Sequence, residues 1–311
     1  MLHRIDQFSD VPPPCQRGFV SIGNFDGVHR GHCMLIECMR SIARRSAGPA
    51  VAFTFDPHPV SLLRPQHAPV PLTWTERKAE LLHEQGVDEV VVIHTRMELL
   101  RLSAEQFFDQ VIRSKLQARG LVEGPNFGFG RDRSGTITTL NRLCAPAGIQ
   151  LEVVDPLEDE GQVVSSTRIR QCLAAGQVEA TGRLLGRPHR IRGNVVAGAG
   201  RGNTLGFPTA NMRNPETFVP ADGVYACRVQ FAENTWPAAV HIGANTTFGE
   251  ANRQLEAHLI GFAGDLRGQQ LEVDFLARLR GTQRFESPAA LISQIRNDVE
   301  RAAAIARDGM A

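Results

Sequence analysis

Residues 23–32 read Gly23-Asn24-Phe25-Asp26-Gly27-Val28-His29-Arg30-Gly31-His32. The apolar run before this stretch, residues 19–22, has the composition of a strand, and the apolar residues after it, from Leu35 to Ile42, recur at helical spacing. The sequence therefore predicts a glycine-rich turn from a strand into a helix. Such a turn directs backbone N–H groups and the positive end of the helix dipole at one place, which suits a phosphate.

Two histidines close this stretch. His29 and His32 stand three residues apart at the predicted helix start, so both rings can face the same phosphate chain. The glycines allow the backbone to approach a ligand closely. A lone His-x-x-His pair is also consistent with chance, with a metal site or with a helix cap, but the stretch as a whole favours phosphate binding.

The stretch resembles the nucleotide-binding signature of the nucleotidyltransferase superfamily, which ends in His-x-Gly-His. With Asn-Phe-Asp-Gly-Val-His in front, it is similar to the adenylyltransferase half of the bacterial bifunctional riboflavin kinase/FMN adenylyltransferases (FAD synthetases). The resemblance implies that the two histidines act on phosphate during adenylyl transfer. It also implies nucleotide contacts at Gly23, Phe25, Asp26 and Gly27.

Composition limits the class of protein. A chain of 311 residues suggests two domains, and a net charge of +1 gives no strong field for nucleic acid or an anionic membrane. The six cysteines form no Cys-x-x-Cys pair and no zinc-site spacing, which is typical of reduced thiols in the cytoplasm. Residues 1–14 lack the apolar core of a secretory signal, and no apolar run approaches the ~20 residues of a membrane helix. We therefore expect a cytoplasmic protein that binds neither nucleic acid nor membrane.

The first half alternates apolar runs with helical patterns. Strands are predicted at residues 19–22, 50–55, 89–94, 120–122 and 149–154, and helices at residues 75–85, with Thr73 or Thr75 as the cap, and after Ser103. This alternation predicts a Rossmann-like α/β domain with a parallel, doubly wound sheet. Ligands of such sheets bind beyond the carboxyl ends of the strands, which is where the polar motifs of this half fall.

Two loops follow predicted strands of this half. Residues 56–59 read Asp-Pro-His-Pro, and because proline suits neither a helix interior nor a sheet ladder, we expect a loop there, either a rigid connector or a ligand loop. Residues 124–130 interleave glycine with Phe127 and Phe129, which suits a flat ligand such as adenine or isoalloxazine, or an ordinary loop over the core. This second loop resembles the family's loop of Asp or Asn and Phe-x-Phe-Gly, with Asn126 at the polar position.

A third motif, Ser165-Ser166-Thr167-Arg168, opens a predicted helix. Its hydroxyl and N–H groups can hold anions, and Arg168 adds a charge-assisted contact to phosphate. A plain helix cap followed by a surface arginine is the alternative. The motif is similar to a serine, threonine and arginine element of the same family, which implies that it clamps the ATP triphosphate.

Adenylyl transfer poses a charge problem. Joining the FMN phosphate to the α-phosphorus of ATP brings two anions together and releases pyrophosphate, with no covalent protein intermediate. Positioning can supply roughly 7–11 kcal/mol, and fixed donors and a metal ion stabilise the charge that develops at phosphorus. We expect Mg²⁺ to arrive with ATP, held partly by phosphate oxygens.

The pattern changes in the second half. A helix predicted at residues 176–186 is broken by Gly186-Arg187-Pro188, and downstream the apolar period falls from about 3.6 to about 2 residues. We place the boundary near Leu185, giving domains of residues 1–185 and 186–311. Alternating strands at residues 225–231, 255–259 and 271–275 predict a small antiparallel β-barrel, followed by a C-terminal helix with Ser287 as N-cap and Pro288 as its first residue.

One stretch of this half carries chemistry: Gly200-Arg201-Gly202-Asn203-Thr204-Leu205-Gly206-Phe207-Pro208-Thr209-Ala210-Asn211. Its glycine N–H groups can form an anion nest, and Thr209 and Asn211 are neutral oxygen donors on one side of an extended segment, which suits Mg²⁺. A barrel hairpin loop is the alternative. The stretch resembles the riboflavin kinase signature, Gly-x-x-Leu-Gly-Phe-Pro-Thr-Ala-Asn, which implies nucleotide contacts at Gly202, Gly206 and Pro208.

Glu256 is the key carboxylate of the second half. It shares a strand face with His258 and points away from Leu255 and Leu259, and a glutamate in such a position ordinarily faces solvent. The local pattern resembles the family's Glu-x-His-Leu. That resemblance implies that Glu256 is the general base for the riboflavin 5′-hydroxyl, with the γ-phosphate held in line by the metal and its ligands.

The chain departs from the family pattern at Thr246, Gly261, Arg267 and Thr282, where the family usually has Pro, Asp or His, Tyr and Glu. None of these positions is the matched base or a metal ligand. Several lie near the expected flavin or nucleotide, so they bear on the efficiency of the kinase half rather than on adenylyl transfer.

The two signatures together imply a two-step enzyme, in which riboflavin and ATP give FMN, and FMN and ATP give FAD and pyrophosphate. Two alternatives stay open: an FMN adenylyltransferase with a kinase-inactive flavin-binding barrel, and a non-catalytic flavin sensor. The implied ligands are riboflavin, FMN, ATP and Mg²⁺, with flavin-dependent apoproteins as recipients of FAD. A weak homo-oligomer is left open.

Overall fold

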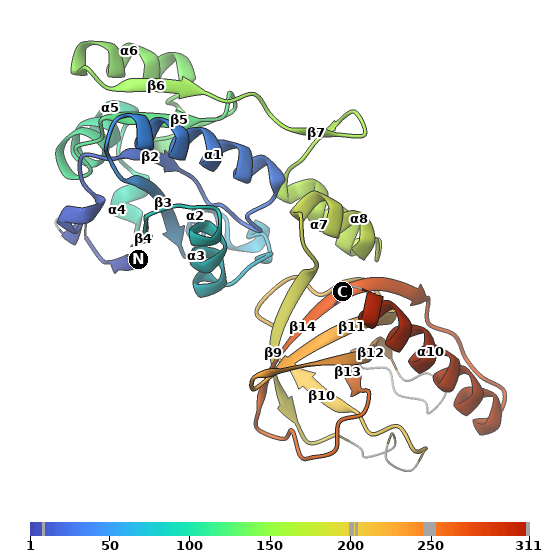
Figure 1. Ribbon diagram of the computed structural model, residues 1–311. Coiled ribbons are helices and arrows are strands. Elements are labelled where there is room, and N and C mark those ends of the chain that lie inside the picture. Colours follow the sequence, from blue (N-terminus) through green and yellow to red (C-terminus); the bar gives the residue numbers. More distant parts are fainter. Residues whose placement is uncertain (8–9, 199–201, 203–204, 245–252, 309–311) are drawn as a thin grey trace. The chain divides into compact units, whose positions relative to one another are not determined.

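The structure is a computed structural model that describes residues 1–7, 10–198, 202, 205–244 and 253–308 (Figure 1). The chain divides into two compact units. The first comprises Met1–Val70 and Trp74–Val164, and the second comprises Pro71–Thr73 and Ser165–Ala311. Residues 165–185, which the sequence analysis places in the first domain, group with the second unit in this division. The boundary at Leu185 stays a prediction.

The first unit contains a six-stranded sheet in which every neighbouring pair is parallel, with the strand order β1-β4-β3-β2-β5-β6. Its strands are β1 (Leu2–Ile5), β2 (Phe19–Ile22), β3 (Ala50–Asp56), β4 (Glu89–His94), β5 (Gly120–Glu123) and β6 (Gln150–Val153). The five predicted strands are all present, and β1 is an additional strand at the sheet edge. The prediction of a Rossmann-like α/β domain is confirmed.

Helices cover both faces of this sheet, as a parallel sheet requires. The helical elements are η2 (Pro13–Cys15), α1 (Arg30–Arg45), α2 (Pro59–Leu63), η3 (Pro65–His67), α3 (Thr75–Glu84), α4 (Met97–Leu100), α5 (Ala104–Phe107), the π-helix η4 (Phe108–Lys115), η5 (Arg131–Arg133) and α6 (Ile137–Ala147), and a short hairpin follows, β7 (Glu158–Asp159) and β8 (Gln162–Val163). Val51 and Phe53 of β3 pack in one core with α4, α5, η4 and α6. Ala50 and Ala52 pack in the other with α1 and α3, because successive strand residues point to opposite faces.

Two local predictions for this unit are wrong. The N-cap of α3 is Trp74, whose side chain makes no capping hydrogen bond, so neither Thr73 nor Thr75 caps the helix. The prolines after β3 do not exclude a helix, since α2 begins at Pro59 with His58 as its N-cap. Proline is compatible with the first helical position, because the N–H group that it lacks would have no helical partner there.

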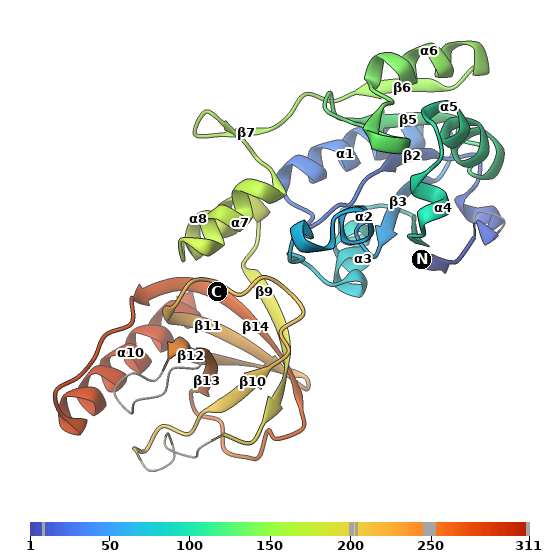
Figure 2. The same ribbon diagram turned by 180° about the vertical axis from the view of Figure 1, so that it is seen from behind.

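The second unit contains a closed, antiparallel six-stranded barrel with the strand order β10-β13-β12-β11-β14-β9 (Figure 2). Its strands are β9 (His189–Val196), β10 (Ala210–Arg213), β11 (Gly223–Phe231), β12 (Asn234–Ala244), β13 (Arg253–Leu259) and β14 (Gln270–Arg280). Its helices are α7 (Ser166–Ala174), α8 (Val178–Leu185) and α10 (Pro288–Asp308). The predicted barrel and C-terminal helix are confirmed, and the Ala290 N–H donates to the Ser287 hydroxyl at the predicted cap. No helix in the described part of the chain is long and apolar enough to cross a lipid bilayer.

The first strand of the barrel begins with a buried histidine. His189 of β9 is 1% exposed, and its Nε2–H donates to the Phe218 carbonyl oxygen at 2.7 Å. Its Nδ1 has no hydrogen-bond partner among the described residues. Burial disfavours the charged imidazole and lowers the pKa of His189 from 6.5 to about 4.

We expect His189 to make the barrel sensitive to acid. The ring binds its proton with a pKa of about 4 in the folded chain and 6.5 in the unfolded chain, so its contribution to stability is complete above pH 6.5 and is lost as the pH falls through this window. The loss is on the order of 3 kcal/mol. The free energy of unfolding, measured with urea at a series of pH values, should fall more steeply toward acid pH for the wild type than for His189→Gln. The glutamine side chain cannot titrate. Equal slopes for the two proteins would contradict this role.

Candidate functional site

The turn between β2 and α1 has a strained backbone. Phe25, Gly27 and Val28 have left-handed φ angles of 45°, 84° and 39°. Only glycine adopts such angles freely, and for a β-branched residue such as Val28 they are rare. Phe25 and Val28 are 2% and 1% exposed, so packing holds the turn in this shape. Strain of this kind concentrates at binding sites and active sites.

His29 and His32 cap α1 reciprocally. The His32 N–H donates to His29 Nδ1, and the His29 N–H donates to His32 Nδ1, each at 3.3 Å. The two rings stack with their centroids 3.6 Å apart, and Phe25 meets His32 edge-on at 5.4 Å. The pair is therefore a helix cap, one of the alternatives left open by the sequence. Because each Nδ1 accepts a hydrogen bond, the proton of each neutral ring is on Nε2, away from the capped N–H group.

Gly31 allows a second segment to approach the start of α1. A Cβ on Gly31 would lie 3.2 Å from His29 Nδ1 and 3.3 Å from the Val164 carbonyl oxygen. Val164 is buried and ends the first unit, and Ser165 follows it in the chain. The segment that leads into the Ser-Ser-Thr-Arg motif therefore passes the histidine cap.

The predicted anion-binding segment opens α7, in the second unit. Ser165 is the N-cap, and its hydroxyl accepts a hydrogen bond from the Arg168 N–H at 3.2 Å. Ser166 and Thr167 begin the first helical turn. Arg168 is half-buried, and so is Arg170. The start of α7 thus combines hydroxyl groups, helix N–H groups and guanidinium groups, all of which can bind an anion.

A buried lysine lies close to two acidic residues of the first unit. Lys78 of α3 and Asp26 of the β2–α1 turn are each 8% exposed. Burial lowers the pKa of Lys78, while the negative charges of Asp26 and Asp56 act in the opposite direction. Asp56 also accepts a hydrogen bond from the Thr75 hydroxyl at 2.8 Å. Lys78 is therefore a buried amine beside the turn, and its two acidic neighbours oppose the effect of burial on its pKa.

β5 ends in a buried acid. Glu123 is 2% exposed, and its Oε1 accepts a hydrogen bond from the Ile22 N–H, at the end of β2, at 2.8 Å. Burial raises the pKa of Glu123 well above its usual value. The Glu123 side chain thus links the C-terminal ends of β2 and β5. The loops that follow these two strands contain the predicted nucleotide contacts.

The loop after β5 has both a packing role and an exposed polar position. Phe129 is 5% exposed, stacks on Phe127 with centroids 5.5 Å apart and lies 6.0 Å from Phe107 of the core. The alternative of a loop over the core therefore describes Phe129, whereas half-buried Phe127 remains a candidate ligand contact. Asn126 is exposed, and its carbonyl oxygen accepts a hydrogen bond from Arg133 at 3.0 Å.

In the second unit, strand register brings three polar residues together. Asn211 of β10 is directly opposite Glu256 of β13, and Glu256 is directly opposite His241 of β12. Leu255 and Ala257 are buried, so Glu256 points to the other face of β13. His241 Nδ1 lies 3.7 Å from Glu256 Oε2. An amide, a carboxylate and an imidazole therefore lie on one face of these three strands.

Two glycines lie closely against the two predicted metal ligands. A Cβ on Gly198 would lie 2.0 Å from Asn211 Nδ2. A Cβ on Gly202 would lie 3.1 Å from the Thr209 hydroxyl and 2.4 Å from the Phe207 carbonyl oxygen. The Asn211 amide and the Thr209 hydroxyl offer neutral oxygen donors, which suit a hard cation such as Mg²⁺.

The loop before β10 is tied to β13. The Pro208 carbonyl oxygen accepts a hydrogen bond from His258 Nδ1–H at 2.7 Å, and the Phe207 ring meets the His258 ring edge-on with centroids 5.7 Å apart. Gly206 has a left-handed φ of 83°, which glycine adopts without strain. Residues 200–201 and 203–204 of the signature lie outside the described residues.

Three of the four departures from the family pattern fall in the described part of the chain. Gly261 has a left-handed φ of 83°, so an aspartate or histidine there would be strained. Arg267 forms an ion pair with Asp265, and Thr282 is exposed. Thr246 lies outside the described residues.

Two family models match the chain: that of FAD synthetase over residues 13–168 and that of riboflavin kinase over residues 185–306. A bifunctional riboflavin kinase/FMN adenylyltransferase from Pseudomonas fluorescens is 39% identical, over 94% of this chain and 94% of its own. The protein of the same name from Escherichia coli K12 is 34% identical, over 96% of this chain and 95% of its own. The chain belongs to the bifunctional riboflavin kinase/FMN adenylyltransferase family.

This chain is therefore an ATP-dependent transferase that phosphorylates riboflavin to FMN and adenylylates FMN to FAD. A solved structure described as a macrolide-efflux protein from Streptococcus pneumoniae has the same fold, with a TM-score of 0.88 and 32% identity over 97% of this chain and 98% of that chain. Its name denotes a different activity from those named by both family models and the curated relatives, and its likeness to this chain is one of fold. It supports an α/β layer followed by a barrel.

Three residues near the predicted sites were not predicted from the sequence: Asn24, Lys78 and His241. Asn24 Oδ1 is buried without a hydrogen-bond partner in the described part of the chain. The turn between β2 and α1 therefore contains an acceptor that a ligand could use. Lys78 left a weak signal, because it stands on the apolar face of α3, three residues before Leu81. His241 left none, since only the pairing of β12 with β13 brings it to Glu256.

We expect Gly198→Ala to impair riboflavin phosphorylation. Its Cβ would collide with the Asn211 amide at 2.0 Å, and because this side chain can move, the barrel should fold with a predicted metal ligand displaced. The Mg²⁺ concentration for half-maximal FMN formation should rise about 10–100-fold, as for loss of a group that orients a metal ligand. Gly281→Ala is the matched control, because its Cβ would meet nothing within 4 Å. Similar Mg²⁺ dependence in the two variants would contradict the role of Asn211.

Proposed function

We propose that residues 1–185 form the adenylyltransferase domain and residues 186–311 the riboflavin kinase domain, each with its own active site. The ranges of the family models, 13–168 and 185–306, support this division. α8 ends at Leu185, and Gly186 has the left-handed conformation that commonly ends a helix. Separate sites suit the chemistry, because one reaction takes the γ-phosphoryl group of ATP and the other attacks its α-phosphorus.

In FMN adenylylation, His29, His32, Ser165 and Arg168 bind phosphate. An oxygen of the FMN phosphate attacks the α-phosphorus of ATP, the bond from that phosphorus to the pyrophosphate oxygen breaks, and pyrophosphate leaves. The reciprocal cap carries this assignment, because it fixes two imidazole rings at the N-terminus of α1, where the helix dipole favours negative charge. Positioning of the two anions supplies roughly 7–11 kcal/mol of the barrier reduction.

Three segments supply the remaining nucleotide and flavin contacts of this domain. The turn brings its backbone against the nucleotide, the loop after β5 holds the nucleotide or flavin, and the start of α7 adds donors to the triphosphate. These contacts are assigned to Gly23, Phe25, Asp26, Gly27, Asn126, Ser166 and Thr167.

In riboflavin phosphorylation, Glu256 accepts the proton of the 5′-hydroxyl as its oxygen attacks the γ-phosphorus and ADP leaves. Thr209 and Asn211 hold Mg²⁺, which neutralises phosphate charge when bound. Their neutral oxygens and the pairing of Asn211 with Glu256 across β10 and β13 support this ligand set. His241, across the strand pair from Glu256, positions the carboxylate. The loop N–H groups and carbonyls that contact ATP are assigned to Gly202, Gly206 and Pro208.

We place the enzyme in the cytoplasm. The six cysteines are all free, which is typical of a reducing compartment. Its small-molecule ligands are riboflavin, FMN, ATP and Mg²⁺, and flavin-dependent apoproteins receive the FAD. A weak homo-oligomer stays a prediction.

Glu256→Gln should abolish FMN formation and leave FMN adenylylation intact. The amide keeps the shape of the carboxylate but cannot take a proton, so riboflavin phosphorylation should fall about 10²–10⁴-fold. Purified protein is incubated with ATP, Mg²⁺ and either riboflavin or FMN, and the three flavins are separated by chromatography. Loss of both activities would contradict separate sites.

His32→Ala should have the reverse effect. Loss of one fixed donor to the reacting phosphates should slow FAD formation about 10²–10³-fold, and FMN made from riboflavin should accumulate. The same assay reads this outcome, and Glu256→Gln serves as the reciprocal control. Normal FAD output would remove His32 from phosphate binding.

A further inference from the structure

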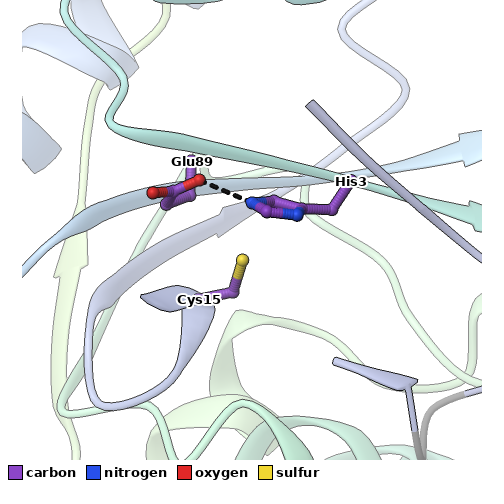
Figure 3. Close-up of side chains that lie close together, drawn as sticks. All are labelled: His3, Cys15 and Glu89. Carbon is purple, nitrogen blue, oxygen red and sulfur yellow. Dashed lines mark hydrogen bonds and ion pairs between the residues drawn. The ribbon is translucent and has the colours of Figure 1, made fainter. Parts of the chain in front are cut away.

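Three potential metal ligands meet in the first unit, and none of them belongs to either predicted active site. His3 lies on β1, Cys15 on η2 and Glu89 at the start of β4, and one ligand atom of each lies within 4.8 Å of the other two. His3 Nε2 and Glu89 Oε2 are 2.7 Å apart. Figure 3 shows the Cys15 sulfur pointing toward the space between the imidazole and the carboxylate. Their residue types offer one nitrogen, one sulfur and one oxygen donor.

The sheet explains this convergence. β1 and β4 are parallel neighbours, and His3 is paired with Val91. His3 alternates in phase with Ile5, and Glu89 with Val91, so both point to the face whose core includes Cys15. Glu89 is the first residue of β4, so the cluster lies toward the amino ends of the strands. The histidine cap follows the carboxyl end of β2, so it lies at the other end of the strands.

We propose that His3, Cys15 and Glu89 bind a divalent transition-metal ion of the Zn²⁺ class. Zn²⁺ accepts nitrogen, sulfur and carboxylate oxygen together in a tetrahedral site, whereas Mg²⁺ and Ca²⁺ prefer oxygen alone. Three protein ligands leave the fourth position to water. The site is distinct from the Mg²⁺ ligands assigned in the barrel.

The geometry needs only small adjustments. Zinc bonds of about 2.0–2.3 Å place tetrahedral ligands about 3.4–3.7 Å apart, so shifts of about 1 Å suffice here. The side chains of His3 and Glu89 are 15% and 18% exposed, which gives an ion access, while Cys15 is fully buried. The amino group of Met1 lies 3.2 Å from Glu89 Oε2, and the ion displaces this contact.

The same cluster does not suit thiol chemistry. Burial, assisted by the negative charge of Glu89, raises the pKa of Cys15 to about 12, so without an ion the thiol keeps its proton and is a poor nucleophile. A metal ion replaces that proton and neutralises the carboxylate. Its structural effect is to tie the edge strand β1 to β4 and η2.

Co²⁺ is the probe that tests this proposal, because a Co²⁺–thiolate bond gives a charge-transfer absorption in the near ultraviolet that oxygen ligands do not give. The full chain is titrated with Co²⁺ in excess Mg²⁺. We expect one Co²⁺ per chain with this absorption, and its loss on addition of Zn²⁺. Absence of the absorption in the wild type would overturn the proposal.

Substitutions test whether Cys15 supplies the sulfur ligand. Cys15→Ala should lose the absorption, and its Co²⁺ affinity should fall more than the roughly 10–100-fold expected for loss of a group that only orients a ligand. Glu89→Gln keeps the shape and should weaken binding without removing the absorption. Cys144→Ala is the matched control, because Cys144 is a buried thiol of the same core, and it should behave as wild type. Equal losses of absorption and of Co²⁺ affinity in Cys15→Ala and Cys144→Ala would overturn the proposal. FMN-to-FAD conversion by each preparation verifies that the protein is folded.

Discussion

The reciprocal cap of His29 and His32 is the interaction on which the first unit depends. A serine or aspartate cap satisfies helix N–H groups with one short side chain, whereas here two imidazoles each accept from the other residue's backbone. Each ring is thereby fixed by a hydrogen bond at Nδ1 and by stacking on its partner. Removal of one ring takes away the stacking partner of the other but leaves the backbone N–H that donates to it, so the two rings support each other only through stacking. The left-handed Val28 just before the cap is the strain that this arrangement requires.

The barrel places its functional groups by a different constraint. Asn211, Glu256 and His241 are adjacent only because β10, β13 and β12 pair in one register. A slip of one residue would turn Glu256 into the apolar side and Leu255 out of it, so the buried positions of β13 fix the register and with it the kinase site. The first unit orients donors through a helix start, and the second orients them through the alternation of strands. The alternation of buried and half-buried residues along β13 thus also decides where the predicted kinase residues lie.

The sequence predicts most of the fold because its signals are local. Apolar runs mark the strands, and Ser103, Ser165 and Ser287 mark helix starts through their own hydroxyl groups. Strand β1 escaped prediction because polar residues interrupt its short apolar pattern, and only pairing with β4 makes it a strand. Partners distant in sequence also explain why His241 was missed. The matched motifs fixed which residues are candidates, but their neighbours came from register and packing.

In a parallel sheet the carboxyl ends of the strands and their amino ends offer different chemical groups, and this protein uses the two ends differently. At the carboxyl ends, glycine turns and helix starts present N–H groups and imidazole donors, which suit phosphate oxygens. At the amino ends of β1 and β4, side chains rather than backbone groups converge, and they offer nitrogen, sulfur and oxygen. Cysteine spacing could not reveal this, because Cys15 meets its neighbours through strand pairing. Since hard and borderline ions prefer different donor sets, a phosphate-bound Mg²⁺ and an ion at His3, Cys15 and Glu89 would not compete for the same ligands.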